Sequence, residues 1–463
     1  MSDIIRNKRS MLLALVVGIL VITSCQPAPP PTPQVVEVTR IVAGTPQTIV
    51  TTATPPPAAA TGPVKITVWN YLVPENYPQI VPIYEAYNKQ FMADHPGVTV
   101  EMYAPPYEGS DAKYAAAFAG RTGAPDVFIG RVTYLAGGLG VADPAPKDVS
   151  DCWDSHAVEI IKPYLKYNGA YYGFPLETDL GMMLFYNKDM FTEAGLDPNK
   201  PPQTFDELLA DAKKLTKTDA AGNITQEGFA VRFSGNARGI ADKWLPFLHA
   251  WGGRLYAEDG STSQGYLNSP EAVASLDYYA GLVTKDKVAS LSLGKPDDAF
   301  PKKQAAMFFR EAWMVGVLRD TAPDINYGVA PLPKQQVNPG FSLLFEDGYM
   351  VYKFSPNKDM AWQWLKGLTC DQNISLEQAK AAGILPTFKE LWSDPYMSGR
   401  PDIAVENAIM TNPAGPVYET PYINDLSFRV GQAIQEAMFG QKTAQKALDD
   451  AVSDVDAILG RSK

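Results

Sequence analysis

The chain has 463 residues, of which 46% are hydrophobic and 20% are charged, so it can bury a large core and form two or more globular units. Its formal net charge is −11, and no cluster of basic residues offsets it. These values exclude a disordered chain and a chain embedded in the membrane along its length, and they disfavour binding to nucleic acid or anionic lipid.

Residues 1–24 have the pattern of a signal peptide. Three basic residues precede an apolar run, Met11–Ile22, that is too short to span a membrane as a folded helix. The following ITSC sequence resembles a bacterial lipobox, so we expect Cys25 to become a lipid-modified N-terminus; the alternative is an anchoring helix with an incidental cysteine. Loss of three basic residues and one acidic residue changes the net charge to about −13.

Residues 25–63 have the composition of a tether. Residues 26–63 contain ten prolines and eight threonines, with only two charged residues. Such a composition favours extended chain and cannot bury a core. The segments 35–38 and 49–52 are β-prone, so a transient strand is an alternative, but we expect a solvated stalk.

The folded part begins with an alternation of strands and helices. Val64–Trp69 and Val98–Tyr103 are predicted strands, and apolar residues at helical spacing between 80 and 91 predict a helix between them. After a helix at 115–119, the DVFI sequence at 126–129 predicts a further buried strand. The order of strand, helix and strand favours a parallel sheet.

Residues 167–208 hold a polar connection between two predicted strands. An aromatic strand ends at Pro175, polar residues follow, and an apolar strand covers 182–186. We interpret the connection as a hinge. Beyond it, Thr204 and Glu207 form the pattern of a capping box, which predicts the start of an amphipathic helix.

The remaining elements follow the same periodicities. Apolar and helical patterns predict strands at 228–233, within 302–310 and at 349–354, and helices at 244–251, 271–282, 361–368, 427–439 and 443–459.

No catalytic motif stands out in the sequence. The common nucleophile-elbow, zinc-protease, P-loop and dinucleotide patterns are absent, and the three histidines are far apart. We therefore predict no catalytic residue, no metal site and no cofactor. A pair of catalytic carboxylates for glycoside hydrolysis is an alternative that the sequence does not exclude, because the separation of two carboxylates is a property of the folded chain.

Several motifs together resemble a known family. The sequences YNGAYYGFP, FYNKDMFTEAGL and PPQTFDELL, with AAM at 305–307 and GILPT at 383–387, resemble the family 1 extracellular solute-binding proteins of ABC importers, which are maltose-binding-protein-like carbohydrate-binding lipoproteins. The resemblance extends from Val64 to the C-terminus. The residues Arg310–Ala312 depart from the glycine-rich ending that is common in the family.

The resemblance implies an α/β, two-lobe periplasmic-binding-protein fold, class II-like, with discontinuous lobes joined by a multi-segment hinge. The first lobe would comprise 64–177 and 334–390, and the second 178–333 and 391–463. It would place Cys152 and Cys370 in the same lobe, where they form either a disulfide or two buried thiols.

A sugar site needs flat aromatic surfaces for the ring and polar groups for the hydroxyls. Loops at the carboxyl ends of parallel strands line ligand crevices, and the resemblance implies that Trp313 stacks on a sugar and that Asp179 contacts the ligand. Hydrogen bonding within the hinge is an alternative role for Glu177 and Asp179. Core packing is an alternative role for Trp244 and Trp251. The predicted ligand-binding residues are Tyr71, Glu75, Arg131, Thr133, Glu177, Asp179, Asn236, Arg238, Trp244, Trp251, Trp313, Tyr422 and Asn424.

We therefore expect a lipid-anchored, extracytoplasmic monomer that captures a mono- or oligosaccharide between its lobes. It would deliver this carbohydrate to the permease subunits of an ABC importer, and it would catalyse no reaction and bind no nucleic acid. The alternatives are the same fold with a polyamine or phosphodiester ligand, a secreted carbohydrate-active enzyme, and a surface adhesin.

Overall fold

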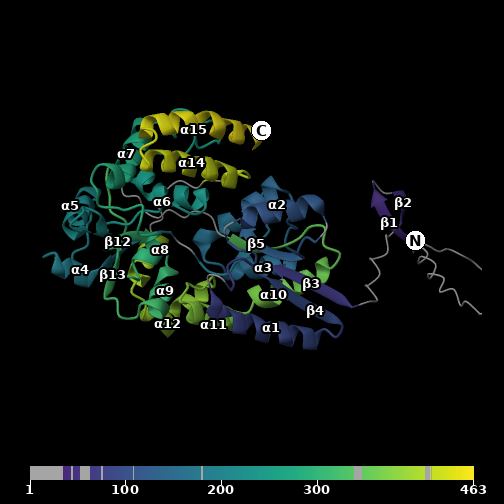
Figure 1. Cartoon of the computed structure of the whole chain (residues 1–463). Coiled ribbons are helices and arrows are strands. Elements are labelled where there is room, and N and C mark those ends of the chain that lie inside the picture. The colour runs from purple at the N-terminus through teal and green to yellow at the C-terminus, as the bar shows by residue number, and fades with distance from the viewer. Residues whose placement is uncertain are drawn as a thin grey trace, which may run out of the picture. The chain divides into compact units, whose positions relative to one another are not determined.

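The computed structural model describes residues 35–42, 45–52, 63–74, 77–107, 109–121, 123–178, 181–337, 347–411, 418 and 420–462. The chain forms two compact units, Met1–Gly62 and Pro63–Lys463 (Figure 1). The expected signal peptide and Cys25 lie outside the described residues.

The first unit contains a β-hairpin. Strands β1 (Val35–Val42) and β2 (Thr45–Thr52) pair antiparallel over their full length, from Val35 opposite Thr52 to Val42 opposite Thr45. This differs from the expected stalk with at most a transient strand. The physical reason is local composition, because valine, isoleucine and threonine dominate both strands and favour extended backbone.

The larger unit contains a five-stranded sheet. Strand β3 is parallel to both β4 and β5, which confirms the predicted parallel sheet, whereas β14 returns antiparallel between β5 and β8. Both β3 and β4 have the predicted bounds. In spatial order, the strands are β4 (Val98–Tyr103), β3 (Val64–Trp69), β5 (Val127–Arg131), β14 (Asp347–Val351) and β8 (Phe174–Pro175).

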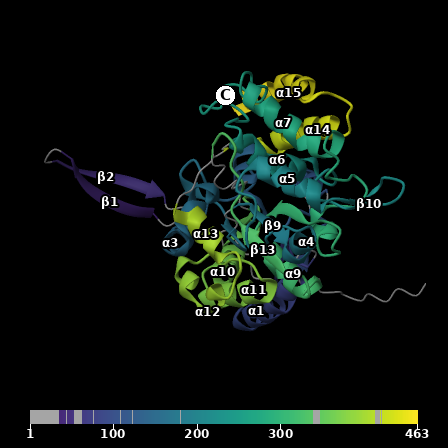
Figure 2. The same ribbon diagram turned by 90° about the vertical axis from the view of Figure 1, so that its left-hand side faces the viewer.

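Helices cover this sheet and complete a first core around Phe128, Trp153, Tyr349 and Trp364. The indole of Trp364 donates to Asn88 Oδ1 over 2.8 Å, so this buried polar group is satisfied. Figure 2 shows α1, α10, α11 and α12 gathered at one end of the unit. The helices are α1 (Val81–Asp94), α2 (Ser110–Gly120), α3 (Lys147–His156), α9 (Met314–Thr321), α10 (Lys358–Thr369), α11 (Gln372–Ala382), α12 (Pro395–Ser398) and α13 (Ile403–Thr411).

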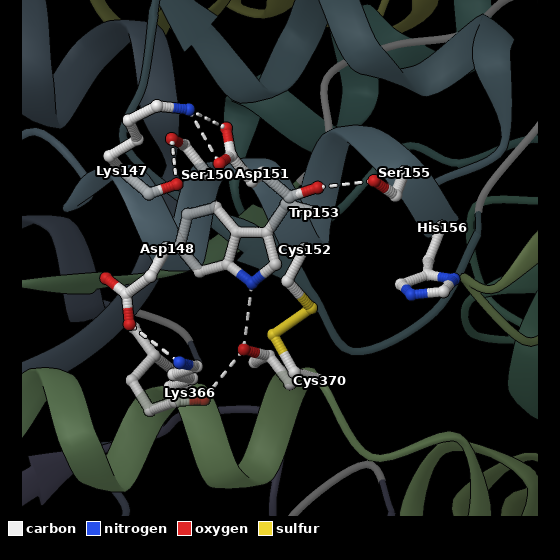
Figure 3. Close-up of a disulfide and its surroundings, with 12 residues drawn as sticks. Lys147, Asp148, Ser150, Asp151, Cys152, Trp153, Ser155, His156, Lys366 and Cys370 are labelled. Atoms are coloured by element: carbon white, nitrogen blue, oxygen red, sulfur yellow. Dashed lines mark hydrogen bonds and ion pairs between the residues drawn. A yellow bond between two sulfur atoms is a disulfide. The ribbon is translucent and has the colours of Figure 1, made fainter.

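A disulfide joins two of these helices. Cys152 in α3 and Cys370 at the end of α10 are bridged, with their Cα atoms 6.2 Å apart (Figure 3). Beside the bridge, the Trp153 indole donates to Thr369 Oγ1 over 2.9 Å. The two helices are thus held together by a covalent bond and by hydrogen bonding.

A second, three-stranded sheet has β9 (Met183–Asn187) at its centre, antiparallel to β12 (Met307–Arg310) and β13 (Tyr327–Ala330). Alternate residues of β9 face different cores, because successive side chains of a strand point to opposite faces. Met183 and Phe185 belong to the first core, and Leu184 and Tyr186 belong to a second.

The second core is covered by helices on the far side of this sheet. Helix α14 packs against α6, α7 and α15, as Figure 1 shows. Thr204 and Glu207 form the predicted capping box at the start of α5. The helices are α4 (Lys188–Glu193), α5 (Phe205–Leu215), α6 (Ala237–Ala250), α7 (Pro270–Thr284), α8 (Pro296–Ala299), α14 (Ile423–Met438) and α15 (Ala444–Leu459).

The prediction of a strand at 228–233 is wrong. The backbone N–H groups of this segment bond to two different partners: Gly228 N and Phe229 N both donate to Val288 O, over 2.9 and 3.3 Å, and Ala230 N donates to Met307 O over 2.8 Å. It therefore runs beside β12 without forming a regular ladder, and its alternating apolar residues reflect burial alone.

Two hydrophobic cores, together with the five-stranded and the three-stranded sheet, thus give the two-lobe α/β fold that was predicted. The lobe boundaries stay predictions, and Val405 and Ile409 of α13 belong to the first core although they lie in a range expected for the second lobe. Across the described helices, none is long and apolar enough to cross a membrane.

Candidate functional site

Helix α6 brings charged residues into the interior. All fourteen of its residues are buried, including Arg238, Asp242 and Lys243. A charge away from water is tolerated only when it is paired. The helix begins at Asn236, whose side chain accepts a hydrogen bond from Arg238 N over 3.0 Å, so Asn236 serves as its N-cap.

A buried ion pair joins the two lobes. Arg131, at the carboxyl end of β5, donates from Nη2 to Asp242 Oδ2 over 3.0 Å. Arg131 is 5% exposed and Asp242 is 7% exposed. Because Arg131 ends a strand of the first lobe and Asp242 lies in helix α6 of the second, this pair stabilises the lobes in contact.

A second polar link lies close by. Arg238 donates from Nη2 to Tyr107 Oη and from Nη1 to Asn424 Oδ1, both over 3.3 Å. The Tyr107 ring meets the edge of Tyr71 with centroids 5.5 Å apart, and Tyr71 donates to Asp347 Oδ2 over 2.6 Å. Aromatic and polar groups from both lobes therefore meet in one place.

The turn after β5 also approaches the second lobe. A Cβ added at Gly138 would lie 2.3 Å from the carbonyl oxygen of Pro421, so only glycine fits there. Thr133 begins this short helical turn, Thr133–Gly138, and is half-buried. It thus lies near the lobe contact, as its position after the strand predicted.

The hinge holds a carboxyl group in an unusual environment. Tyr77 Oη donates to Glu177 Oε1, and burial, with the charges of Glu311 and Asp347, raises the pKa of Glu177 to about 7. The next residue, Thr178, bonds through its backbone N–H to Leu385 O over 3.0 Å. The hinge is therefore fixed to a third segment of the chain.

The raised pKa of Glu177 predicts a pH-dependent stability. The unfolded chain loses this proton near pH 4.5 and the folded protein near pH 7, so folding free energy is lost between these values as the pH rises. We expect Glu177→Gln, which keeps an acceptor for Tyr77, to raise the free energy of unfolding by about 2 kcal/mol at pH 8 and by less than about 1 kcal/mol at pH 5. Both expected changes in the free energy of unfolding allow for screening by water around the partly exposed Glu177 side chain.

Urea unfolding at both pH values measures this difference. Glu85→Gln on the exposed face of α1 is the matched control and should change stability by less than about 0.5 kcal/mol at either pH. An equal effect of Glu177→Gln at pH 5 and pH 8 would show that the carboxyl group titrates normally.

A charged cluster lies on the other side of α6. Glu311 accepts from Lys243 Nζ and, over 2.9 Å, from Arg310 Nη1. Burial alone would raise the pKa of Glu311, but these two cations lower it to about 2. Arg310 also donates from Nη2 to Asp297 over 2.7 Å and lies 4.5 Å from the ring centroid of Trp313.

The other predicted aromatic residues lie apart from the lobe contact. Trp244 is 0% exposed and Trp251 is 6% exposed, both in the second core. Tyr422 donates to Arg461 O over 3.3 Å at the C-terminal turn. Glu75 and Asp179 lie outside the described residues.

The structure therefore brings four predicted residues together, namely Tyr71, Arg131, Arg238 and Asn424. Sequence reasoning missed Tyr107, Asp242, Lys243, Asp297 and Asp347. One signal was present, because the adjacent charges Asp242 and Lys243 interrupt an otherwise apolar helical pattern.

The donor set offers no evident metal chemistry. Within the described ranges, histidine, cysteine, aspartate and glutamate side chains form no group of three or more that could hold a metal ion.

Two α/β lobes that meet over buried aromatic and polar side chains define a two-lobe binding protein. A family model described as bacterial extracellular solute-binding protein matches residues 86–403, so the chain belongs to that family. The family is extracellular, which places the protein outside the cytoplasm.

Individual relatives have low sequence identity to this chain but match most of its length. A binding protein of Brucella abortus (strain 2308) is 24% identical over 410 residues, covering 87% of this chain and 94% of the relative. A maltotriose-binding protein of Pyrococcus abyssi is 24% identical over 360 residues, covering 74% and 71%. Among solved structures, an ABC transporter solute-binding protein of Thermotoga lettingae bound with alpha-D-tagatose is 23% identical, with a TM-score of 0.72 and coverage of 86% and 100%, which supports the fold.

Proposed function

We propose that this protein captures a carbohydrate between its lobes and delivers it to the permease subunits of an ABC importer. The observation that carries the proposal is the meeting of tyrosine rings, an ion pair and an amide from both lobes at Tyr71, Tyr107, Arg131–Asp242 and Asn424. Such a mixture of flat apolar surface and hydrogen-bonding groups suits sugar rings and hydroxyls. The names of the maltotriose- and tagatose-bound proteins support the ligand class.

The lobes are proposed to close on the ligand by a shift of population. A ligand that touches both lobes stabilises the closed arrangement only by the contacts it gains there. The ion pair of Arg131 and Asp242 would contribute part of the free energy that stabilises the closed arrangement. The contacts of the ligand would therefore not have to contribute all of it.

The proposed ligand contacts are those near the lobe contact and the charged cluster. They are Tyr71, Arg131, Thr133, Glu177, Arg238, Trp313 and Asn424, with Glu75, Asp179 and Tyr422 as further candidates. The burial of Trp244 and Trp251 supports a packing role for both, and the cap formed by Asn236 supports a role in starting α6.

We propose that the protein is a monomer and that it remains at the cell surface. Cys25 would carry the lipid anchor, and residues 25–63 would let the lobes reach the permease. No reaction is proposed, because the family and the structural relatives are binding proteins.

A calorimetric titration of the mature chain against a panel of mono- and oligosaccharides tests the proposal. We expect at least one saccharide to bind and to raise the melting temperature, since a ligand that binds only the folded state stabilises it. Binding to polyamines or glycerophosphodiesters without any response to sugars would contradict the carbohydrate assignment. Release of reducing sugar from an incubated glycan would contradict the absence of catalysis.

A further inference from the structure

Two adjacent glycines of the first lobe face the second lobe. Gly137 and Gly138 end the short helical turn that follows β5, and a Cβ added at Gly138 would lie 2.3 Å from the carbonyl oxygen of Pro421. A Cβ added at Gly137 would lie 3.1 Å from the Pro421 side chain. Non-bonded heavy atoms pack best at separations of roughly 3.5 Å or more. The first lobe therefore presents bare backbone to Pro421.

The turn that carries Gly138 is fixed to the first lobe. Leu135 is 2% exposed and belongs to the first core. Beyond the glycines, Leu139 N donates to Tyr134 O over 2.9 Å. Two residues later, Val141 N donates to Leu135 O over 3.0 Å. These bonds close the turn on itself, so Gly138 moves only with its lobe.

Pro421 is fixed to the second lobe in the same way. Ile423 N donates to Thr420 O over 3.2 Å, which closes the turn that holds Pro421. Ile423 and Leu426, in the first turn of α14, are 0% exposed and belong to the second core. Because the blocking atom is a backbone oxygen, no change of rotamer moves it away. Extra volume at Gly138 is therefore relieved only by separation of the two lobes.

We propose that Gly138 permits complete closure of the lobes, and that side-chain size at this position sets the closed fraction of the protein without any contact to the ligand. Hinged lobes exchange between open and closed arrangements, and a ligand that touches both lobes binds the closed one best. Apparent affinity falls in proportion to the fraction of protein in the binding-competent state. The inference rests on the proposed function, because it describes how binding at that site is controlled.

Alanine at position 138 is compatible with the fold of the first lobe. The φ angle of Gly138 lies outside the left-handed region that favours glycine. After the atoms of Pro421, the next atom that the added Cβ would meet is Tyr134 Cδ2 at 3.3 Å, on a side chain that can shift slightly. Gly137 is a poorer choice, since a Cβ there would lie 2.6 Å from Tyr167 Cε2 within the first lobe. Gly138→Ala thus acts on the contact between the lobes.

The distance between the lobes tests the inference directly. Nitroxide labels are attached to p-acetylphenylalanine in place of Ala86 on α1 and Ser453 on α15, two exposed positions in different lobes, so that the cysteines stay unchanged. Electron–electron double resonance gives the distance distribution of the mature chain without ligand and with an excess of maltotriose. We expect a short, closed distance in at least one condition, and we expect Gly138→Ala to lose at least about 90% of that population.

Calorimetry adds a result that a residue in contact with the ligand would not give. Gly138→Ala should weaken the binding of each saccharide that binds the wild-type chain by the same factor, at least about 10-fold, because all ligands depend on one closed population. The melting temperature of the ligand-free variant should change by less than about 2 °C. The matched control is Gly460→Ala, where nothing lies within 4 Å of the added Cβ, and it should change affinity less than about 2-fold.

The outcomes separate this inference from the proposed function. The inference is wrong if the labelled chain with Gly138 shows no closed distance in either condition, if Gly138→Ala keeps the closed population, or if the variant weakens different saccharides by different factors. A fall of more than about 5 °C in the melting temperature of both Gly138→Ala and Gly138→Ser would also contradict it, since the contact would then lie within one rigid unit. If no saccharide binds the wild-type chain, the proposed function fails, while the label distances still decide whether Gly138 governs closure.

Discussion

Replacing both Cys152 and Cys370 with serine is expected to lower the free energy of unfolding of the first lobe by about 3–5 kcal/mol. The bridge joins residues 218 positions apart, so it restricts a very long loop in the unfolded chain. Urea unfolding followed by tryptophan fluorescence measures the loss, because Trp153 lies beside the bridge in the first core.

Two controls separate the bridge from the side chains. Reduction of the wild-type chain by dithiothreitol should reproduce the destabilisation, and Thr369→Val, which removes only the hydrogen bond from Trp153, should cost about 1 kcal/mol. An unfolding midpoint that neither reduction nor the serine variant changes would mean that the two residues are unbridged thiols.

Replacing Asp242 with alanine is expected to weaken saccharide binding by about 100-fold or more. The closed arrangement would then bury Arg131 without its carboxylate, and breaking a buried pair by removing one partner costs about 3–5 kcal/mol. The lobes avoid this cost by opening, so the closed state becomes rare and the apparent affinity falls with its population.

Calorimetry with the tightest-binding saccharide measures this effect. The control is Asp320→Ala, which removes an exposed ion pair with Arg319 and a hydrogen bond from Gln79, and it should change affinity less than about 5-fold. Wild-type affinity in Asp242→Ala would show that the ion pair does not govern closure.

Much of the fold could be predicted from local patterns. Strands 64–69 and 98–103 are delimited by sharp changes in composition, and the capping box at Thr204 depends on residues three positions apart. The segment 228–233 was misread because alternating apolar residues indicate burial, whereas a strand also needs a neighbour that continues the ladder.

The site depends on contacts that no local pattern encodes. Arg131 and Asp242 are 111 positions apart, and their pairing follows from the way two lobes meet. Tyr107 could be placed beside Arg238 only once the chain was folded. For Trp244, the same aromatic character fits a sugar platform and a core, and only its burial distinguishes the two roles.

The most direct test of the central claim is a crystal structure of the mature chain with the saccharide that binds most tightly. We predict that the sugar contacts both lobes at once, with Tyr71 or Arg131 on one side and Arg238, Asn424 or Trp313 on the other. A sugar that is bound to a single lobe, or that lies away from these residues, would contradict capture between the lobes.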